Sequence, residues 1–413
     1  MRKALKFYYS SVDFLFYILC GLIAVKPEFL HFKFGNASIS LTSARNFAIF
    51  FSIYVLPYVV EKFREHFKEN KNIFILAVCY IWIAVSIIVN NERLFYRNSS
   101  FWVISVYFLF YLYVYLRFKY GEEKTFYNIF FWGFLIVNTG NLIFHFSKGI
   151  NKIIEDYPFW SGKNMFSVIA IGSFFTAVDF FYKNKRKLLA IFLASVSFAN
   201  LMTVYSRAGL IAFVSAVFLW SLWFMLKKSG KKLTIGIFFM ILVLAFSFVP
   251  SKNRLRLKDA LMIKDYNTRE RIEIWKGALK IIRKNILFGI GAGKFSEKFF
   301  EMESNFKFER IKEKRKNYHA HNLFLQIASE SGILPAVLLS LYYGWILFYA
   351  LVLYKENGSN RGMVLFLFAF FIYSFFDSSY NAKFTHSSMF HLNLIILLFL
   401  AYIDAYINKF KKT

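Results

Sequence analysis

Between Asn72 and Asn90 the sequence reads NIFILAVCYIWIAVSIIVN, an apolar run without a charged side chain. A run of about 18 or more such residues is long enough to cross the hydrocarbon core of a bilayer as a helix. The whole chain shares this character, because 58% of its 413 residues are hydrophobic and 56 are Phe. A water-soluble domain of this size could not cover so much apolar surface. The sequence therefore predicts an all-α, polytopic membrane protein.

Similar runs on both sides of residues 72–90 predict about twelve transmembrane helices in total. They lie near residues 9–25, 45–60, 72–90, 100–117, 125–146, 164–182, 187–205, 208–226, 233–250, 323–353, 361–378 and 387–407. These runs divide the chain into three parts. We expect helices 1–9 within residues 1–250, a loop domain at 251–321, and helices 10–12 within 322–413.

The formal net charge of +28 follows membrane topology rather than a nucleic-acid surface. Basic side chains gather on alternate connections, which is the pattern of cytoplasmic loops, where they also attract anionic lipid headgroups. This pattern places both termini in the cytoplasm and the loop 251–321 on the outer side. We expect membrane lipids, and no nucleic acid, around this surface. The basic connections contain Lys62, Arg64, Lys68 and Lys71; Lys183, Lys185, Arg186 and Lys187; and Lys227, Lys228, Lys231 and Lys232.

The loop 251–321 is polar, with 19 Lys and Arg against 9 Asp and Glu, and we expect it to contain helices. A helical stretch opens near Thr268, a possible N-cap, and runs to about Lys284. Its apolar side chains repeat at helical spacing, which predicts an amphipathic helix along the membrane surface. They are Ile272, Trp275, Leu279 and Ile282.

Three glycines, Gly289, Gly291 and Gly293, follow this stretch. The run lacks the Lys-Ser/Thr of a nucleotide-binding loop, so we interpret it as a tight turn that folds the loop back onto the membrane domain.

Candidate catalytic side chains gather where the polar loop re-enters the membrane, at His319-Ala320-His321-Asn322. A histidine can accept a proton near neutral pH, as activation of a hydroxyl requires. His321 is the main candidate, and an ordinary interfacial histidine is the alternative. His319 and Asp377 are supporting candidates, since a carboxylate can orient an imidazole, although structural pairing of Asp377 is equally compatible with the sequence.

Two arginines are predicted on the same outer side. Arg207 lies between two apolar runs and would either face a polar partner or extend to headgroups. Arg271 lies in the loop helix, with Arg269 beside it as a further candidate. Two guanidinium groups can hold a diphosphate by forked hydrogen bonds and stabilise the charge that grows on it as it leaves.

This combination suits group transfer from a lipid diphosphate, for which we expect neither cofactor nor metal. The sequence has no Walker motif and no Asp-rich metal motif. Cys20 and Cys79 fall inside predicted spans and have no metal-ligand spacing.

At these residues the chain resembles the O-antigen ligase and polymerase superfamily of bacterial envelopes. His321-Asn322, nine residues and then Gly332 are similar to the ligase pattern, although Pro335 stands where that pattern usually has Gly, Thr or Tyr. Arg271 and Trp275 with the glycine run resemble the loop motif of the family, and Ser206-Arg207-Ala208-Gly209 resembles its membrane-edge motif. The detailed resemblance covers roughly residues 200–395.

The resemblance implies a metal-independent, inverting glycosyl transfer at the periplasmic side of the bacterial inner membrane. The donor would be a glycan on undecaprenyl diphosphate, and in ligases the acceptor is a sugar hydroxyl of lipid A-core. Arg207 and Arg271 would hold the diphosphate, and His321 would be the base.

Three alternatives remain open: a polysaccharide polymerase with the same donor, a protein O-oligosaccharyltransferase, and a transporter of lipid-linked glycans. A transporter would be expected to place polar groups at mid-membrane. The Arg-ten-residue-Gly pattern of many polymerases is not found in the sequence.

Overall fold

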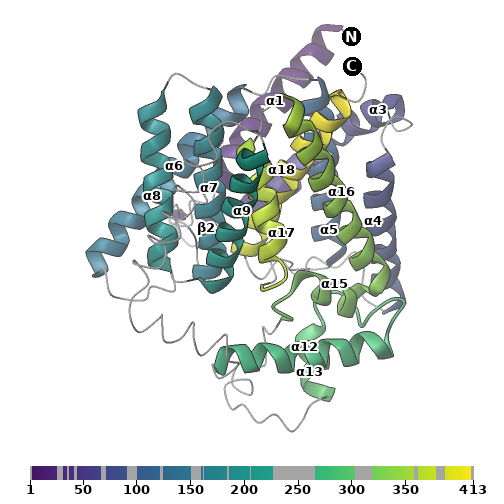
Figure 1. The fold of residues 1–413 in the computed structure, drawn as a ribbon. Coiled ribbons are helices and arrows are strands. Elements are labelled where there is room, and N and C mark those ends of the chain that lie inside the picture. The colour runs from purple at the N-terminus through teal and green to yellow at the C-terminus, as the bar shows by residue number, and fades with distance from the viewer. Residues whose placement is uncertain are drawn as a thin grey trace.

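The computed structural model describes residues 2–25, 31–34, 37–40, 44–66, 71–90, 100–120, 124–149, 160, 162–183, 186–204, 206–226, 266–302, 319–357, 361–377 and 387–410. These residues form a bundle of helices with two further helices, α12 (Tyr266–Lys284) and α13 (Phe295–Met302), at one end (Figure 1). The start of α1 (Arg2–Val25) and the end of α18 (Ser387–Phe410) both lie at the opposite end of the bundle (Figure 1).

The first nine predicted spans correspond to helices wherever the structure describes them. Besides α1 these are α4 (Lys71–Val89), α5 (Ser100–Tyr120), α6 (Lys124–Lys148), α7 (Lys163–Lys183), α8 (Lys187–Val204) and α9 (Arg207–Leu226). The second span consists of two helices, α2 (Ala44–Tyr54) and α3 (Leu56–His66). Pro57 lies in the first turn of α3, where its missing N–H is tolerated. The ninth span, 233–250, lies outside the described residues.

By length and composition, 7 of the described helices can cross a membrane, and α4, α9 and α17 (Arg361–Tyr373) are shorter apolar helices. The predicted all-α, multi-pass membrane class is therefore confirmed. A short antiparallel hairpin, which the sequence analysis did not predict, adds strands β1 (His31–Phe34) and β2 (Ala37–Ser40) between α1 and α2.

The predicted tenth span, 323–353, is not one helix, and this expectation is wrong. Helix α15 (Leu323–Ser331) ends at Gly332, and α16 (Ile333–Asn357) begins directly after it. Gly332 has a φ of 92°, which other residues rarely adopt, and its N–H donates to the Ala328 carbonyl at 3.1 Å. Pro335 then falls in the first turn of α16, where proline favours a new helix start.

Helix α12 is amphipathic as predicted, and Ile282 is buried as expected, but the buried face is centred on other residues. Ile274, Ala278 and Ile281 are fully buried against α13, whereas Leu279, predicted on the apolar face, is 45% exposed. A side chain at Gly277 would overlap the ring of Phe299, so glycine at this position permits α13 to pack closely on α12. Thr268 lies within the first turn of α12 and is not its N-cap.

The glycine run docks against the break between α15 and α16, which supports its interpretation as a turn that folds the loop back. Ile290 N–H donates to the Ser329 carbonyl at 3.0 Å, and Gly291 N–H donates to the Glu330 carbonyl at 2.9 Å. All three glycines have positive φ, and a Cβ at Gly289 would overlap the backbone at Glu330. The described part of the loop is thus joined to the membrane helices through backbone contacts.

Helices α7 and α17 are linked at both of their ends, and this pair carries one half of the site. At one end the buried Asp179 carboxylate of α7 accepts hydrogen bonds from Gly362 N–H at 2.7 Å and Met363 N–H at 3.0 Å, which caps α17. At the other end Asn164 of α7 bonds to Asp377, just after α17. The position of Asp377 is therefore set by packing along the whole length of two helices.

Candidate functional site

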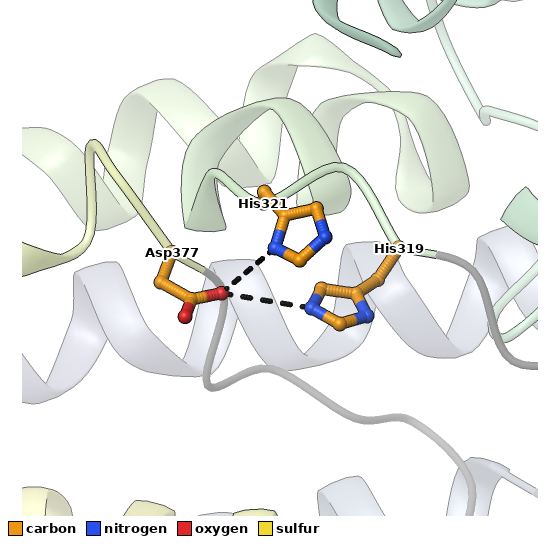
Figure 2. Close-up of side chains that lie close together, drawn as sticks. All are labelled: His319, His321 and Asp377. Atoms are coloured by element: carbon orange, nitrogen blue, oxygen red, sulfur yellow. Dashed lines mark hydrogen bonds and ion pairs between the residues drawn. The ribbon is translucent and has the colours of Figure 1, made fainter. Parts of the chain in front are cut away.

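His319, His321 and Asp377 lie close together (Figure 2). The two histidines precede α15 and Asp377 follows α17, at the end of the bundle where α12 lies (Figure 1). His321 Nδ1 lies 3.1 Å from Asp377 Oδ1, and His319 Nε2 lies 3.6 Å from the same oxygen. The two imidazole rings are 4.2 Å apart between centroids. Asp377 is buried, whereas each histidine keeps about a quarter of its side chain exposed. The sequence-predicted histidines and carboxylate thus form one cluster.

The second oxygen of Asp377 is held by α7 and α17. Its Oδ2 accepts hydrogen bonds from Asn164 Nδ2 at 2.7 Å and from the Tyr373 hydroxyl at 3.2 Å. The Ser206 hydroxyl donates to Asn164 Oδ1 at 3.0 Å, which turns the amide NH₂ toward Asp377. These contacts leave Oδ1 for the histidines.

The loop that carries the histidines is fixed at Ala320, which is fully buried. Ala320 N–H donates to Gln326 Oε1 at 2.6 Å, and its carbonyl accepts from Trp275 Nε1 at 3.0 Å. Gln326 in turn donates to Glu330 at 2.8 Å. The peptide between His319 and His321 is therefore held by α12 and α15 together.

His321 has a φ of 45°, and it is the one non-glycine residue with positive φ in the described part of the chain. Asn322 follows it as the N-cap of α15, because its side chain accepts from Leu325 N–H at 2.9 Å. Asn322 Nδ2 also donates to the Phe375 carbonyl at 3.0 Å, in the turn that leads to Asp377. A left-handed residue held by contacts on both sides is typical of a functional site.

The electrostatics favour a neutral His321 beside an ionised Asp377. Burial, and then the charge of His319, lower the pKa of His321 from 6.5 to about 4. Burial acts to raise the pKa of Asp377, but hydrogen bonds from the two histidines outweigh it and hold that pKa well below its usual range. In this state Nδ1–H of His321 donates to Asp377, and Nε2 keeps a lone pair that can accept a proton.

The two predicted arginines of the loop helix face different ways. The charge of Arg271 is among the causes, after burial and His319, that lower the pKa of His321, so it lies near the site. Arg269 is exposed, on the same side of α12 as the exposed Lys276. No contact between Arg269 and the cluster is seen in the described part of the chain. The supporting role of Arg269 therefore stays a prediction.

Arg207 is the first residue of α9, and the local sequence explains its position. Ser206 caps α9 by accepting from Gly209 N–H at 3.2 Å, and it donates to Asn164. A side chain at Gly209 would overlap Ser167 of α7, so glycine permits this close approach. Arg207 thus directly follows Ser206, which is linked through Asn164 to Asp377 by two hydrogen bonds. The convergence of Arg207 and Arg271 on one diphosphate stays a prediction.

The residues that hold this site were not predicted from the sequence. Asn164, Tyr373, Gln326 and Trp275 contact the cluster or its loop, and none was a candidate for chemistry. His319, His321 and Asp377 also form a group that could hold a metal ion, which was not predicted, with one donor atom from each within 4.8 Å of the others. Asn164 could have been found from the sequence, because a polar side chain at the end of an otherwise apolar span often marks a functional site.

The fold and the site define a multi-pass membrane protein with a histidine–carboxylate pair at one end of its helix bundle. Residues 189–340 match the family described as O-antigen ligase. The match includes Arg207, Arg271, His319 and His321, and it confirms the predicted relationship to the O-antigen ligase and polymerase superfamily. No curated protein matches the chain.

Proposed function

We propose that the protein transfers a glycan from undecaprenyl diphosphate to a sugar hydroxyl of lipid A-core, at the periplasmic face of the bacterial inner membrane. The observation that carries this proposal is the His321–Asp377 pair, with a neutral, oriented imidazole beside Arg271. Such a pair suits the activation of a hydroxyl, and a nearby guanidinium suits a diphosphate. The family match supports ligase- or polymerase-type chemistry in general.

In the proposed reaction His321 Nε2 accepts the proton of the acceptor hydroxyl as its oxygen bonds to the anomeric carbon. The bond from that carbon to the diphosphate breaks, the diphosphate leaves with the electron pair, and the configuration inverts. Asp377 stabilises the imidazolium that forms, while Arg207 and Arg271 stabilise the leaving diphosphate. No step requires a metal, so transfer is expected to continue in the presence of a chelator.

The test is the transfer activity of His321→Ala with purified enzyme, lipid-linked glycan and core acceptor. A positioned base contributes about 10²–10⁴-fold, so His321→Ala should lose activity by that factor, and His319→Ala should lose less. Lys298→Ala is the control, because Lys298 lies on the surface of α13, where it pairs with Glu301 at 2.7 Å. Retention of most activity by His321→Ala would refute the role of the base.

The periplasmic position of the site can be tested with a single introduced cysteine. Cys20 and Cys79 are both buried and should not react with an impermeant thiol reagent. Glu297 is exposed on α13, so Glu297→Cys should be labelled in intact spheroplasts, as the basic connections predict. Labelling only after lysis would reverse the proposed orientation.

A transporter remains the alternative from another class, since buried polar side chains do occur within the bundle. Asn138 Nδ2 donates to Ser173 Oγ at 2.8 Å, and Asn200 Nδ2 donates to the Asn138 carbonyl at 2.8 Å. These bonds join α6, α7 and α8 to one another, a structural use of polar groups between membrane helices. They therefore give no specific support for transport.

A ligase and a polymerase differ in the acceptor. Purified enzyme supplied with lipid-linked glycan alone should form no longer glycan, whereas addition of lipid A-core should yield a ligated product. Chain growth on the lipid-linked glycan without core would favour the polymerase.

A further inference from the structure

The cluster of His319, His321 and Asp377 has a geometry that proton transfer alone does not explain. Both histidines direct a ring nitrogen at the same oxygen, Asp377 Oδ1, at 3.1 and 3.6 Å (Figure 2). One histidine is enough to complete a base–carboxylate pair. Two imidazole nitrogens around one carboxylate oxygen form the donor set of many metal sites.

The spacing of the donor atoms matches a small divalent ion. Zinc binds imidazole nitrogen and carboxylate oxygen at roughly 2.0–2.1 Å, so two ligands of a tetrahedral site lie about 3.3 Å apart. The two separations in the cluster, 3.1 and 3.6 Å, lie on either side of this value. All three donor atoms are within 4.8 Å of one another, so small side-chain rotations would close the set.

The surroundings of the cluster also resemble those of a metal site. The non-ligating oxygen of Asp377 is held by Asn164 and Tyr373, as the outer contacts of metal-binding carboxylates usually are. The two histidines are partly exposed, which leaves room for water at a fourth position. Arg271 is the group that opposes a cation here, because its positive charge acts on His321.

We propose that His319 Nε2, His321 Nδ1 and Asp377 Oδ1 bind a divalent transition-metal ion of the zinc type, and that this ion blocks the use of His321 as a base. A metal on Nδ1 takes the place of the proton that Nδ1 donates to Asp377. The remaining ring proton then resides on Nε2, which has no lone pair left for the acceptor hydroxyl. The binding of the ion is independent of the proposed function, whereas the inhibition rests on it.

The binding is tested by titrating the purified, full-length protein in detergent with Co²⁺, whose visible absorption reports ligation by protein side chains. We expect one saturable site, from which Zn²⁺ displaces Co²⁺. His319→Ala and Asp377→Asn should each abolish the site, and Asn164→Ala should weaken it by about 10–100-fold. His66→Ala is the matched control, because His66 ends α3, which lies near the chain termini at the other end of the bundle (Figure 1).

Arg271→Gln separates this site from a nonspecific one. Loss of the opposing charge should tighten Co²⁺ binding, although the same change should lower glycan transfer. Absence of a saturable site in the wild-type protein, or unchanged binding in His319→Ala, would overturn the proposed metal site.

The inhibition is tested by adding Zn²⁺ to the transfer reaction and then adding a chelator. Wild-type activity should fall as the site fills and return with the chelator, and the residual activity of His319→Ala should resist Zn²⁺. Full activity with the site filled would overturn the inhibition. A protein that binds one ion yet transfers no glycan even with a chelator would instead refute the proposed function.

Discussion

Replacing Gly332 by alanine should separate the loop domain from the helices that carry the site. The backbone at Gly332 has a φ of 92°, and an added Cβ would overlap the carbonyl oxygen of Leu287. That carbonyl belongs to the main chain and is itself held by Trp82 Nε1 at 3.0 Å, so it cannot simply rotate away. The overlap can be relieved only by moving one backbone segment from the other.

The cost can be worked out from the contacts at this point. A non-glycine residue in such a conformation costs about 1–3 kcal/mol. Separation of the segments also removes the bond from Ile333 N–H to the Ile286 carbonyl, 2.9 Å long, which contributes about 0.5–1.5 kcal/mol. The sum is about 1.5–4.5 kcal/mol of folding stability. Because α15 also carries the N-cap beside His321, transfer activity should fall as well.

Gly344→Ala is the matched control, since Gly344 lies in α16 and an added Cβ there meets nothing within 4 Å. In a helix interior alanine is favoured over glycine by about 1 kcal/mol, so this change should be neutral or stabilising. The assay is thermal unfolding of the detergent-purified protein, together with transfer activity in membranes. Equal unfolding temperatures for Gly332→Ala and the wild type would refute the reasoning.

Two further predictions concern the charges of the site. His321 must be unprotonated to accept a proton, and its pKa is lowered from 6.5 to about 4. With a chelator present, kcat/KM should therefore persist as the pH falls through 6.5, and it should decline as the pH approaches 4. His319→Ala removes one cause of the lowering and should move this decline to higher pH, and an unmoved decline would contradict the assignment. Arg207→Lys and Arg271→Lys should each lose most transfer activity at normal expression, because an ammonium group cannot form forked bonds to a diphosphate; wild-type turnover in both would exclude the clamp.

The class of protein could be predicted from the sequence because hydrophobic runs report directly on membrane helices. The break at Gly332 could not, since residues 323–353 are apolar enough to be read as one long span. What divides them is the contact with the glycine run, some 40 residues earlier in the chain. The same limit applies to α12, where the close approach of Phe299 to Gly277 brings the face with Ile274 and Ile281 against α13.

The two histidines and Asp377 could each be identified from the sequence as candidate site residues. That they lie together in one cluster could not be predicted. The partner of Asp377 in α7, Asn164, is separated from it by 213 residues. That contact depends on the pairing of α7 with α17, which a single sequence does not reveal. The role of Trp275 was also not predictable. Its helical spacing indicated an apolar contact, but its indole N–H donates a hydrogen bond to the Ala320 carbonyl.

The geometry also decides which of the two histidines is the better base. His321 is closer to Asp377 Oδ1 than His319 is, at 3.1 against 3.6 Å. His321 is also fixed on both sides, by the buried Ala320 peptide before it and by the cap at Asn322 after it. Orientation within a fraction of an ångström is what gives a general base its effect, so a fixed ring outperforms a looser neighbour. His319 is then left to modulate the charge of His321, and its removal should cost less activity than removal of His321.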